Sequence, residues 1–267
     1  MLFDKIIYIN LERRKDRLVH MKNLLDKYNL QSMSERLNAI DGRKLNLDKI
    51  DKNIITPNGI NDATSAKKMY TVLTKGAIGL IMSQRSIYKK IIDENINACL
   101  ILEDDIRFNA IDNLDLITRL NELEKNINFD YDLLFLGYSP STLKYPHENI
   151  NDYFYKLSRV YGLFGYIVTN KGAKKLLDMF PISSQLDTEI SNNSNNINIY
   201  AVKTNLILSE PSETNTEFGT DIQIREKTDS NNIKYIKYIL FIILVLLIII
   251  VLFYNNPFFF LVNYSVV

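Results

Sequence analysis

The chain has 267 residues and nearly balanced charge, with 32 Lys and Arg against 31 Asp and Glu. This balance leaves no overall basic field to neutralise phosphates, so we expect no nucleic acid partner. The single cysteine, Cys99, excludes a disulfide framework and a Cys-based zinc site.

The predicted elements alternate between strands and helices. The first strand covers residues 5–9, and the helix after it carries an apolar stripe of Leu18, Met21, Leu24, Leu25 and Tyr28. Further strands are predicted at 98–102, 131–136 and 161–169, and helices at 76–95, 111–126 and 171–180. This order predicts an α/β fold with a mainly parallel sheet and helices on both faces. Residues 41–74 and 191–198 have weak periodicity and are predicted to be binding loops.

A long apolar run follows near the C-terminus. Residues 238–254 contain no charge, Gly or Pro, and with their apolar flank they reach the ~20 residues that span a bilayer. Lys234 and Lys237 precede the run, and no Lys or Arg follows it, so we expect a single-pass C-terminal anchor with the catalytic domain cytoplasmic. The predicted division is therefore a domain at 1–227, a tether at 228–234, a transmembrane helix at 235–254 and a tail at 255–267.

Three carboxylates, Glu103, Asp104 and Asp105, directly follow the strand predicted at 98–102. At strand spacing Glu103 and Asp105 point to one side and Asp104 to the other. Crowded like charges require solvent, paired cations or a bound metal. Hard oxygen ligands suit Mg²⁺ or Mn²⁺, and ligands of open α/β sheets gather beyond the carboxyl ends of strands. The triplet by itself leaves both an ion-paired cluster and a metal site open.

A basic cluster lies between the first strand and the first helix, in the segment NLERRKDR at residues 10–17. We expect Asn10 to be the N-cap of the helix. Cations oppose the dipole at this end of a helix, so the cluster indicates an anionic partner such as a diphosphate. The alternative is a solvated face whose cations pair with Glu12 and Asp16.

Gly76 and Gly79 open the helix predicted at 76–95 and permit close approach of another backbone. Ser83, Gln84 and Tyr88 follow within this helix, where ordinary packing explains them equally well. Neither of the two histidines is linked to a nucleophile motif, so a hydrolase triad is excluded. A glycosidase that uses two separated carboxylates remains an alternative.

Seven segments, taken in order, resemble glycosyltransferase family 25, which includes bacterial lipooligosaccharide galactosyltransferases and procollagen galactosyltransferases. They are IYINLERRKDR, ERLNAIDGRKL, LTKGAIGLIMSQRSIYKKIIDEN, CLILEDDIRF, YDLLFLG, GYIVTNKGAKKLL and LDTEI. Together they cover about residues 5–209. The resemblance implies a GT-A, Rossmann-like fold, a UDP-sugar donor, most often UDP-galactose, and a metal, usually Mn²⁺.

The resemblance also assigns roles to individual residues. The predicted donor-binding residues are Asn10, Arg13, Arg14, Arg17, Asp41, Ser83, Gln84 and Asp104. Glu103 and Asp105 are implied to hold the metal, and Asp105 and Asp187 are implied to be catalytic, with Asp187 as a general base toward the acceptor. This chain has Gln84 where the family has His, and Gln185-Leu186 where the family has Pro-Val before the acid.

The resulting hypothesis is metal-dependent transfer of a hexose from a UDP-sugar to a hydroxyl group of a glycan, glycolipid or glycoprotein. Galactose is the first candidate for the hexose, and Mn²⁺ or Mg²⁺ is the expected cofactor. Two alternatives stay open. One is a non-catalytic GT-A-like membrane scaffold for adhesion or assembly, which the replacement of the histidine by Gln84 favours. The other is a metal-dependent nucleotide-sugar hydrolase. Acceptor contacts are expected in the loops at 41–74 and 191–198.

Overall fold

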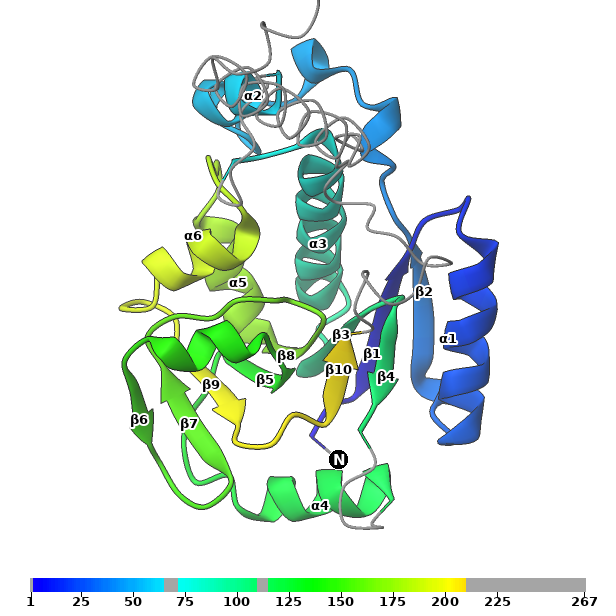
Figure 1. Cartoon of the computed structure of the whole chain (residues 1–267), viewed down its shortest axis with the longest axis vertical. Helices are drawn as coiled ribbons and strands as arrows, with labels where there is room; N and C mark the ends of the chain where they lie inside the picture. The colour runs from blue at the N-terminus through cyan, green and yellow to red at the C-terminus, as the bar shows by residue number, and fades with distance from the viewer. Residues whose placement is uncertain (1, 65–71, 110–114, 210–267) are drawn as a thin grey trace, which may run out of the picture. The chain divides into compact units, whose positions relative to one another are not determined.

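The computed structural model describes residues 2–64, 72–109 and 115–209, which all lie in the compact unit Met1–Gln223 (Figure 1). Its strands are β1 (Lys5–Asn10), β2 (Ser34–Asn38), β3 (Ala98–Glu103), β4 (Ile106–Phe108), β5 (Leu133–Gly137), β6 (His147–Asn149), β7 (Phe154–Leu157), β8 (Gly165–Thr169), β9 (Ile199–Val202) and β10 (Ile207–Ser209). Its helices are α1 (Lys15–Lys27), α2 (Pro57–Thr64), α3 (Lys75–Asp93), α4 (Leu116–Lys125), α5 (Asn170–Asp178) and α6 (Leu186–Asn192). Short 3-10 turns are η1 (Gln31–Met33), η2 (Gly42–Lys44), η3 (Leu47–Lys49) and η4 (Pro140–Lys144).

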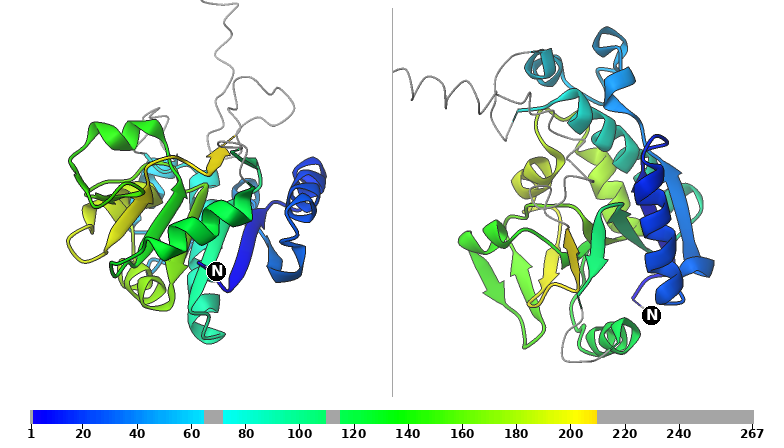
Figure 2. Two further views of the ribbon diagram at one scale, coloured as in Figure 1. Left: turned by 90° about the horizontal axis from the view of Figure 1, so that it is seen from below. Right: turned by 45° about the vertical axis from the view of Figure 1, so that its right-hand side comes forward.

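Eight strands form one mixed sheet in the order β2-β1-β3-β8-β5-β9-β7-β6. The strands β2, β1 and β3 are parallel neighbours, as are β5 and β9. Strand β8 runs antiparallel to both β3 and β5, because the chain reaches it through the β6–β7 excursion instead of a helical crossover. The strands β4 and β10 pair separately and lie side by side (Figure 2).

The sheet separates two hydrophobic cores. Alternate side chains of the central strands enter opposite cores, as Ile7 and Ile6 in β1 and Ile101 and Leu100 in β3 do. One core contains apolar residues of α3, α5 and α6, and the other contains residues of α1 and α4. Helices therefore cover both faces, and the α/β part of the predicted fold is confirmed.

The backbone of helix α3 is in direct contact with the backbone of the segment after β2. A Cβ built on Gly42 would lie 2.0 Å from the backbone oxygen of Lys75, and one built on Gly79 would lie 2.4 Å from the oxygen of Ile40. Only glycine fits at these contacts. The close approach predicted for the helix glycines is confirmed at Gly79, and it brings the start of α3 against residues 40–42.

Several predicted boundaries were wrong. Asn10 ends β1, and the N-cap of α1 is Arg14, so the basic residues up to that point precede the helix. Helix α4 begins at Leu116 because the Asp115 carboxylate caps it by accepting a hydrogen bond from the backbone N–H of Thr118. The supposed loop at 41–74 contains η2, η3 and α2.

The predicted transmembrane helix and the membrane localisation need correction. Across residues 2–64, 72–109 and 115–209, no helix is both long enough and apolar enough to cross a bilayer. The longest, α3, has 19 residues and carries Lys and Arg side chains along its length. The finding gives no support to the C-terminal membrane helix, the single-pass anchor or the membrane partner, and these predictions are not retained. The segment on which they rested, residues 235–254, lies outside the described residues.

Candidate active site

The carboxyl ends of three neighbouring parallel strands meet at one edge of the sheet. In the register of β1 and β3, Ile9 pairs with Glu103, so Asn10 lies beside the start of the acidic triplet. Strand β2 ends at Asn38 on the other side of β1, and the chain then continues to Asp41. Ligands of open α/β sheets bind at such an edge. The fold thus gathers segments that are far apart in sequence.

Asp104 is the centre of a buried polar network. Its Oδ2 accepts a hydrogen bond of 2.7 Å from the Asn10 side-chain amide, and its Oδ1 accepts one of 2.7 Å from Arg17 Nη1. Arg36 donates in turn to the Asn10 side-chain oxygen at 2.9 Å. The side chains of Arg17 and Asp104 are only 7% and 8% exposed. Both oxygens of Asp104 are therefore engaged by protein groups.

The two other carboxylates of the triplet are less well compensated. Arg17 Nη2 lies 3.0 Å from Asp105 Oδ2, while Asp105 Oδ1 is buried without a hydrogen-bond partner among the described residues. Burial raises the pKa of Asp105, against the opposing effect of Arg17. Burial first, and then the charges of Asp105 and Asp104, raises the pKa of Glu103 to about 8. These two side chains favour an added cation.

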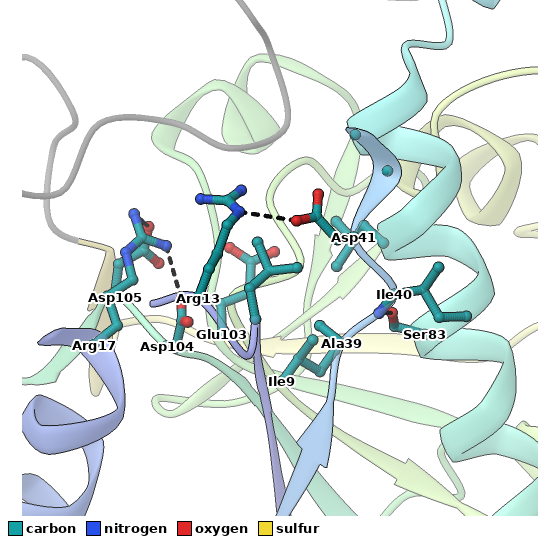
Figure 3. Close-up of a pocket in the computed structure, with 14 residues that line it drawn as sticks. Ile9, Arg13, Arg17, Ala39, Ile40, Asp41, Ser83, Glu103, Asp104 and Asp105 are labelled. Atoms are coloured by element: carbon teal, nitrogen blue, oxygen red, sulfur yellow. Dashed lines mark hydrogen bonds and ion pairs between the residues drawn. The ribbon is translucent and has the colours of Figure 1, made fainter. Parts of the chain in front are cut away.

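Asp41 joins two arginines at the neighbouring strand end. Arg43 donates to both of its carboxylate oxygens, at 3.1 and 2.9 Å, and Arg13 Nε donates to Oδ2 at 3.0 Å. Hydrogen bonds from Arg43, followed by those from Arg13, hold the pKa of Asp41 well below its usual range. Figure 3 shows Arg13 extending past Glu103 toward Asp41.

Helix α3 contributes Ser83 to the site but turns Gln84 away from it. Ser83 Oγ accepts a hydrogen bond of 2.9 Å from the backbone N–H of Ile40, which fixes the segment before Asp41. Gln84 is 0% exposed, and its Oε1 accepts a hydrogen bond of 2.8 Å from the Tyr166 hydroxyl. Gln84 is thus part of the core between α3 and β8.

Asp187 lies in the first turn of α6 with its carboxylate held by backbone groups. Its Oδ1 accepts from the N–H of Thr188 at 2.7 Å, and its Oδ2 accepts from the N–H of Gly162 at 3.3 Å. Gly162 has φ +83°, a conformation that favours glycine. Burial raises the pKa of Asp187, although these hydrogen bonds oppose the shift. A carboxyl with a raised pKa is better suited to accept a proton near neutral pH.

Two cavities meet at Glu103. The first, of about 90 Å³, has Arg13, Arg17, Asp41 and Ser83 among its lining residues, together with the acidic triplet (Figure 3). The second, of about 540 Å³, contains Asp187 in its wall, together with residues of the segments after β5 and before β8. Glu103 and Leu80 line both cavities. The two compartments therefore share the carboxylate at the end of β3.

The structure gathers most of the predicted site residues. Those that line a cavity are Arg13, Arg17, Asp41, Ser83, Glu103, Asp104, Asp105 and Asp187. Asn10 supports them through Asp104, whereas Arg14, the N-cap of α1, is 11% exposed and donates to Asp16 at 2.8 Å from Nη2. The wall formed by Ser139 and Ser141 was missed, although the sequence SPS two residues after the strand predicted at 131–136 was a usable signal.

The acidic residues suit a cation shared with a ligand better than a closed metal cage. Within the part of the chain that the structure describes, no group of three or more His, Cys, Asp or Glu side chains is arranged to hold a metal ion. Asp105 Oδ1 nevertheless lacks a partner there, and burial, followed by the charges of the neighbouring carboxylates, raises the pKa of Glu103. Mg²⁺ commonly uses one or two carboxylates together with substrate phosphates, so two such residues fit the predicted ion.

Sequence comparisons identify similar proteins. The profile described as "Glycosyltransferase family 25 (LPS biosynthesis protein)" matches residues 3–190. Similar proteins include procollagen galactosyltransferase 1-B of Xenopus laevis, with 32% identity over 199 residues, and procollagen galactosyltransferase 2 of Mus musculus, with 30% identity over 192 residues. Each alignment covers 71% of this chain but 30% of the relative. The chain therefore spans under a third of the length of these relatives.

Proposed function

We propose that this chain, which belongs to glycosyltransferase family 25, transfers a hexose from a UDP-sugar to a hydroxyl group of a glycan or protein. Galactose is the first candidate for the hexose. The observation that carries the proposal is the pair of cavities that meet at Glu103. A transferase needs a donor and an acceptor on either side of one reacting centre. We assign the donor to the first cavity and the acceptor to the second.

On the donor side, the arginines supply the charge that a diphosphate requires. Arg17 is fixed by Asp104 and Asp105, whereas Arg13 crosses the first cavity to Asp41. A cavity of about 90 Å³ is too small for a nucleotide sugar, since ligand pockets usually measure about 300–1,000 Å³. We expect the donor diphosphate to take over Arg13 from Asp41 and thereby widen the site.

Glu103 and Asp105 are the residues that would hold Mn²⁺ or Mg²⁺, because their carboxylates are incompletely compensated. A divalent cation bound with the donor would offset the diphosphate charge and act as a Lewis acid toward the leaving UDP. Asp104 has a separate role in the proposal. It is committed to Arg17 and Asn10, so it orients the donor-side arginine and the end of β1.

On the acceptor side, we assign proton removal to Asp187 for a transfer that inverts the anomeric carbon. Its carboxylate is oriented by the N–H groups of Gly162 and Thr188, and its pKa is raised by burial. Both properties favour a general base. Leu80 and Glu103 line both cavities, and we expect the acceptor hydroxyl to approach from the side of α6.

The test is UDP-galactose hydrolysis and UDP binding, measured with and without Mn²⁺. We expect Mn²⁺-dependent UDP release that falls at least ~100-fold in Asp105→Asn, with the circular dichroism spectrum unchanged. Asp26→Asn, on the exposed face of α1, is the matched control and should retain activity. If neither hydrolysis nor metal-dependent UDP binding occurs, the transferase proposal fails and the scaffold alternative gains. If UDP is released but no added acceptor accelerates its release, the result would favour a nucleotide-sugar hydrolase.

A further inference from the structure

Leu80 is the residue of α3 that lines both cavities. Gly76, Leu80 and Ser83 line the first cavity, and Ala77, Leu80 and Ile81 line the second. Residues three or four positions apart are neighbours on a helix surface, so these residues form two adjacent rows on α3 that meet at Leu80. The two cavities therefore share one side chain of this helix.

Outside α3, the two cavities share Glu103. The carboxyl group of Glu103 can be ionised, protonated or bound to a cation, so its effect on a ligand depends on the state of the site. Leu80 carries no charge and offers no side-chain hydrogen bond in any of these states. Leu80 therefore supplies the apolar part of the shared boundary.

The backbone around Leu80 is fixed on both sides. A Cβ built on Gly79 would lie 2.4 Å from the backbone oxygen of Ile40, so α3 is in direct contact with this segment. Ser83 Oγ donates to the Gly79 backbone oxygen at 2.7 Å and accepts the Ile40 N–H at 2.9 Å (Figure 3). We therefore expect Leu80 to stay at the boundary when a donor widens the first cavity.

Transfer and hydrolysis differ in the oxygen that attacks the donor. In the proposed transfer, an acceptor oxygen forms a bond to the anomeric carbon, and the bond from that carbon to UDP breaks with its electron pair on UDP. The acceptor proton goes to Asp187. A water molecule in the place of the acceptor forms the same bond and loses its proton in the same way. A transferase therefore has to exclude water from the reacting centre.

We propose that Leu80 selects the acceptor hydroxyl over water, because it keeps the boundary between the two cavities apolar. The inference rests on the proposed transfer and adds the origin of its specificity. A buried water needs two to four polar partners, and a leucine side chain provides none. Shortening Leu80 to alanine would open space for about one water molecule or more beside the Glu103 carboxyl.

The test is UDP-galactose hydrolysis with Mn²⁺ and without an acceptor, with the UDP affinity of each variant measured by calorimetry. In Leu80→Ala, the kcat for hydrolysis should rise at least ~5-fold because water reaches the reacting centre, while the Kd for UDP should change less than about twofold. Leu80→Met conserves the apolar volume and should keep the rate of the unaltered chain. If Leu80→Ala does not fold, Leu80→Val replaces it and should raise the rate at least ~2-fold.

Met82→Ala is the matched control, because Met82 is also partly buried against the same core but lies outside the lining of both cavities. Its hydrolysis rate should not change. An unchanged or lower rate in the shortened Leu80 variants, an equal rise in Met82→Ala, or a fall in the UDP affinity of Leu80→Ala would overturn the inference. If the unaltered chain binds UDP, any of these outcomes contradicts the role of Leu80 alone. If the unaltered chain binds no UDP, the proposed function fails, and the role of Leu80 fails with it.

Discussion

Arg17 offers the most direct test of the site, because it neutralises two members of the acidic triplet. It lies 2.7 Å from Asp104 Oδ1 and 3.0 Å from Asp105 Oδ2, and its side chain is 7% exposed. Removing one partner of a buried ion pair costs about 3–5 kcal/mol, since the remaining charge stays buried. In Arg17→Met, Asp104 keeps its hydrogen bond from Asn10. We therefore expect a loss near the lower limit, about 3 kcal/mol.

The assay is urea denaturation at pH 7 without metal or donor, with Lys15→Met as the control. Lys15 pairs with Glu12, but their side chains are 63% and 58% exposed, so this control should change the free energy of unfolding very little. A double-mutant cycle with Asp104→Asn should give a combined loss well below the sum of the single losses. Equal losses for Arg17→Met and Lys15→Met, or strict additivity in the cycle, would show that the buried pair does not hold the site together.

Three further predictions concern groups around the first cavity. Asp41→Asn should lower the free energy of unfolding at neutral pH, because hydrogen bonds lower the pKa of this carboxyl in the folded state. The loss of stability should be complete above pH about 5 and should shrink as the pH falls below about 4. Denaturation at several pH values would detect this dependence. Gly42→Ala forces a Cβ to within 2.0 Å of the Lys75 backbone oxygen, so thermal denaturation should report a loss of at least about 1–3 kcal/mol. Gln84→Leu leaves the buried Tyr166 hydroxyl without this acceptor and should cost about 1–3 kcal/mol, while the KM for UDP-galactose changes less than twofold; a large rise in KM would instead make Gln84 a donor contact.

Much of the architecture could be predicted because it depends on local patterns. The apolar run before Glu103 indicated a buried strand, and the structure has β3 at Ala98–Glu103. The position of β8 between β3 and β5 could not be predicted, because strand order depends on which segments pair across the chain. The short strands β4, β6 and β10 also escaped prediction, since three residues are too few to show a period.

The candidate site divides in the same way. The basic segment and the acidic triplet were visible in sequence, but which cation faces which acid was not. Arg17 and Asp104 are 87 positions apart, and they meet because β1 and β3 are parallel neighbours whose carboxyl ends coincide. The sequence suggested Asn10 as a helix cap, whereas in the fold its amide binds Asp104.

The sequence by itself determined the alternation of strands and helices, the acids at the end of β3 and, through ordered motifs, the family. Each of these features depends on patterns of residues that are near one another in the sequence. Only the tertiary structure decided that Glu103 lies between two cavities and that Asp187 stands in the wall of the second, 84 positions away (187 − 103). The physical reason is that a cavity is made by surfaces of several elements, and the packing of α3 and α6 against the sheet is not encoded in any one segment.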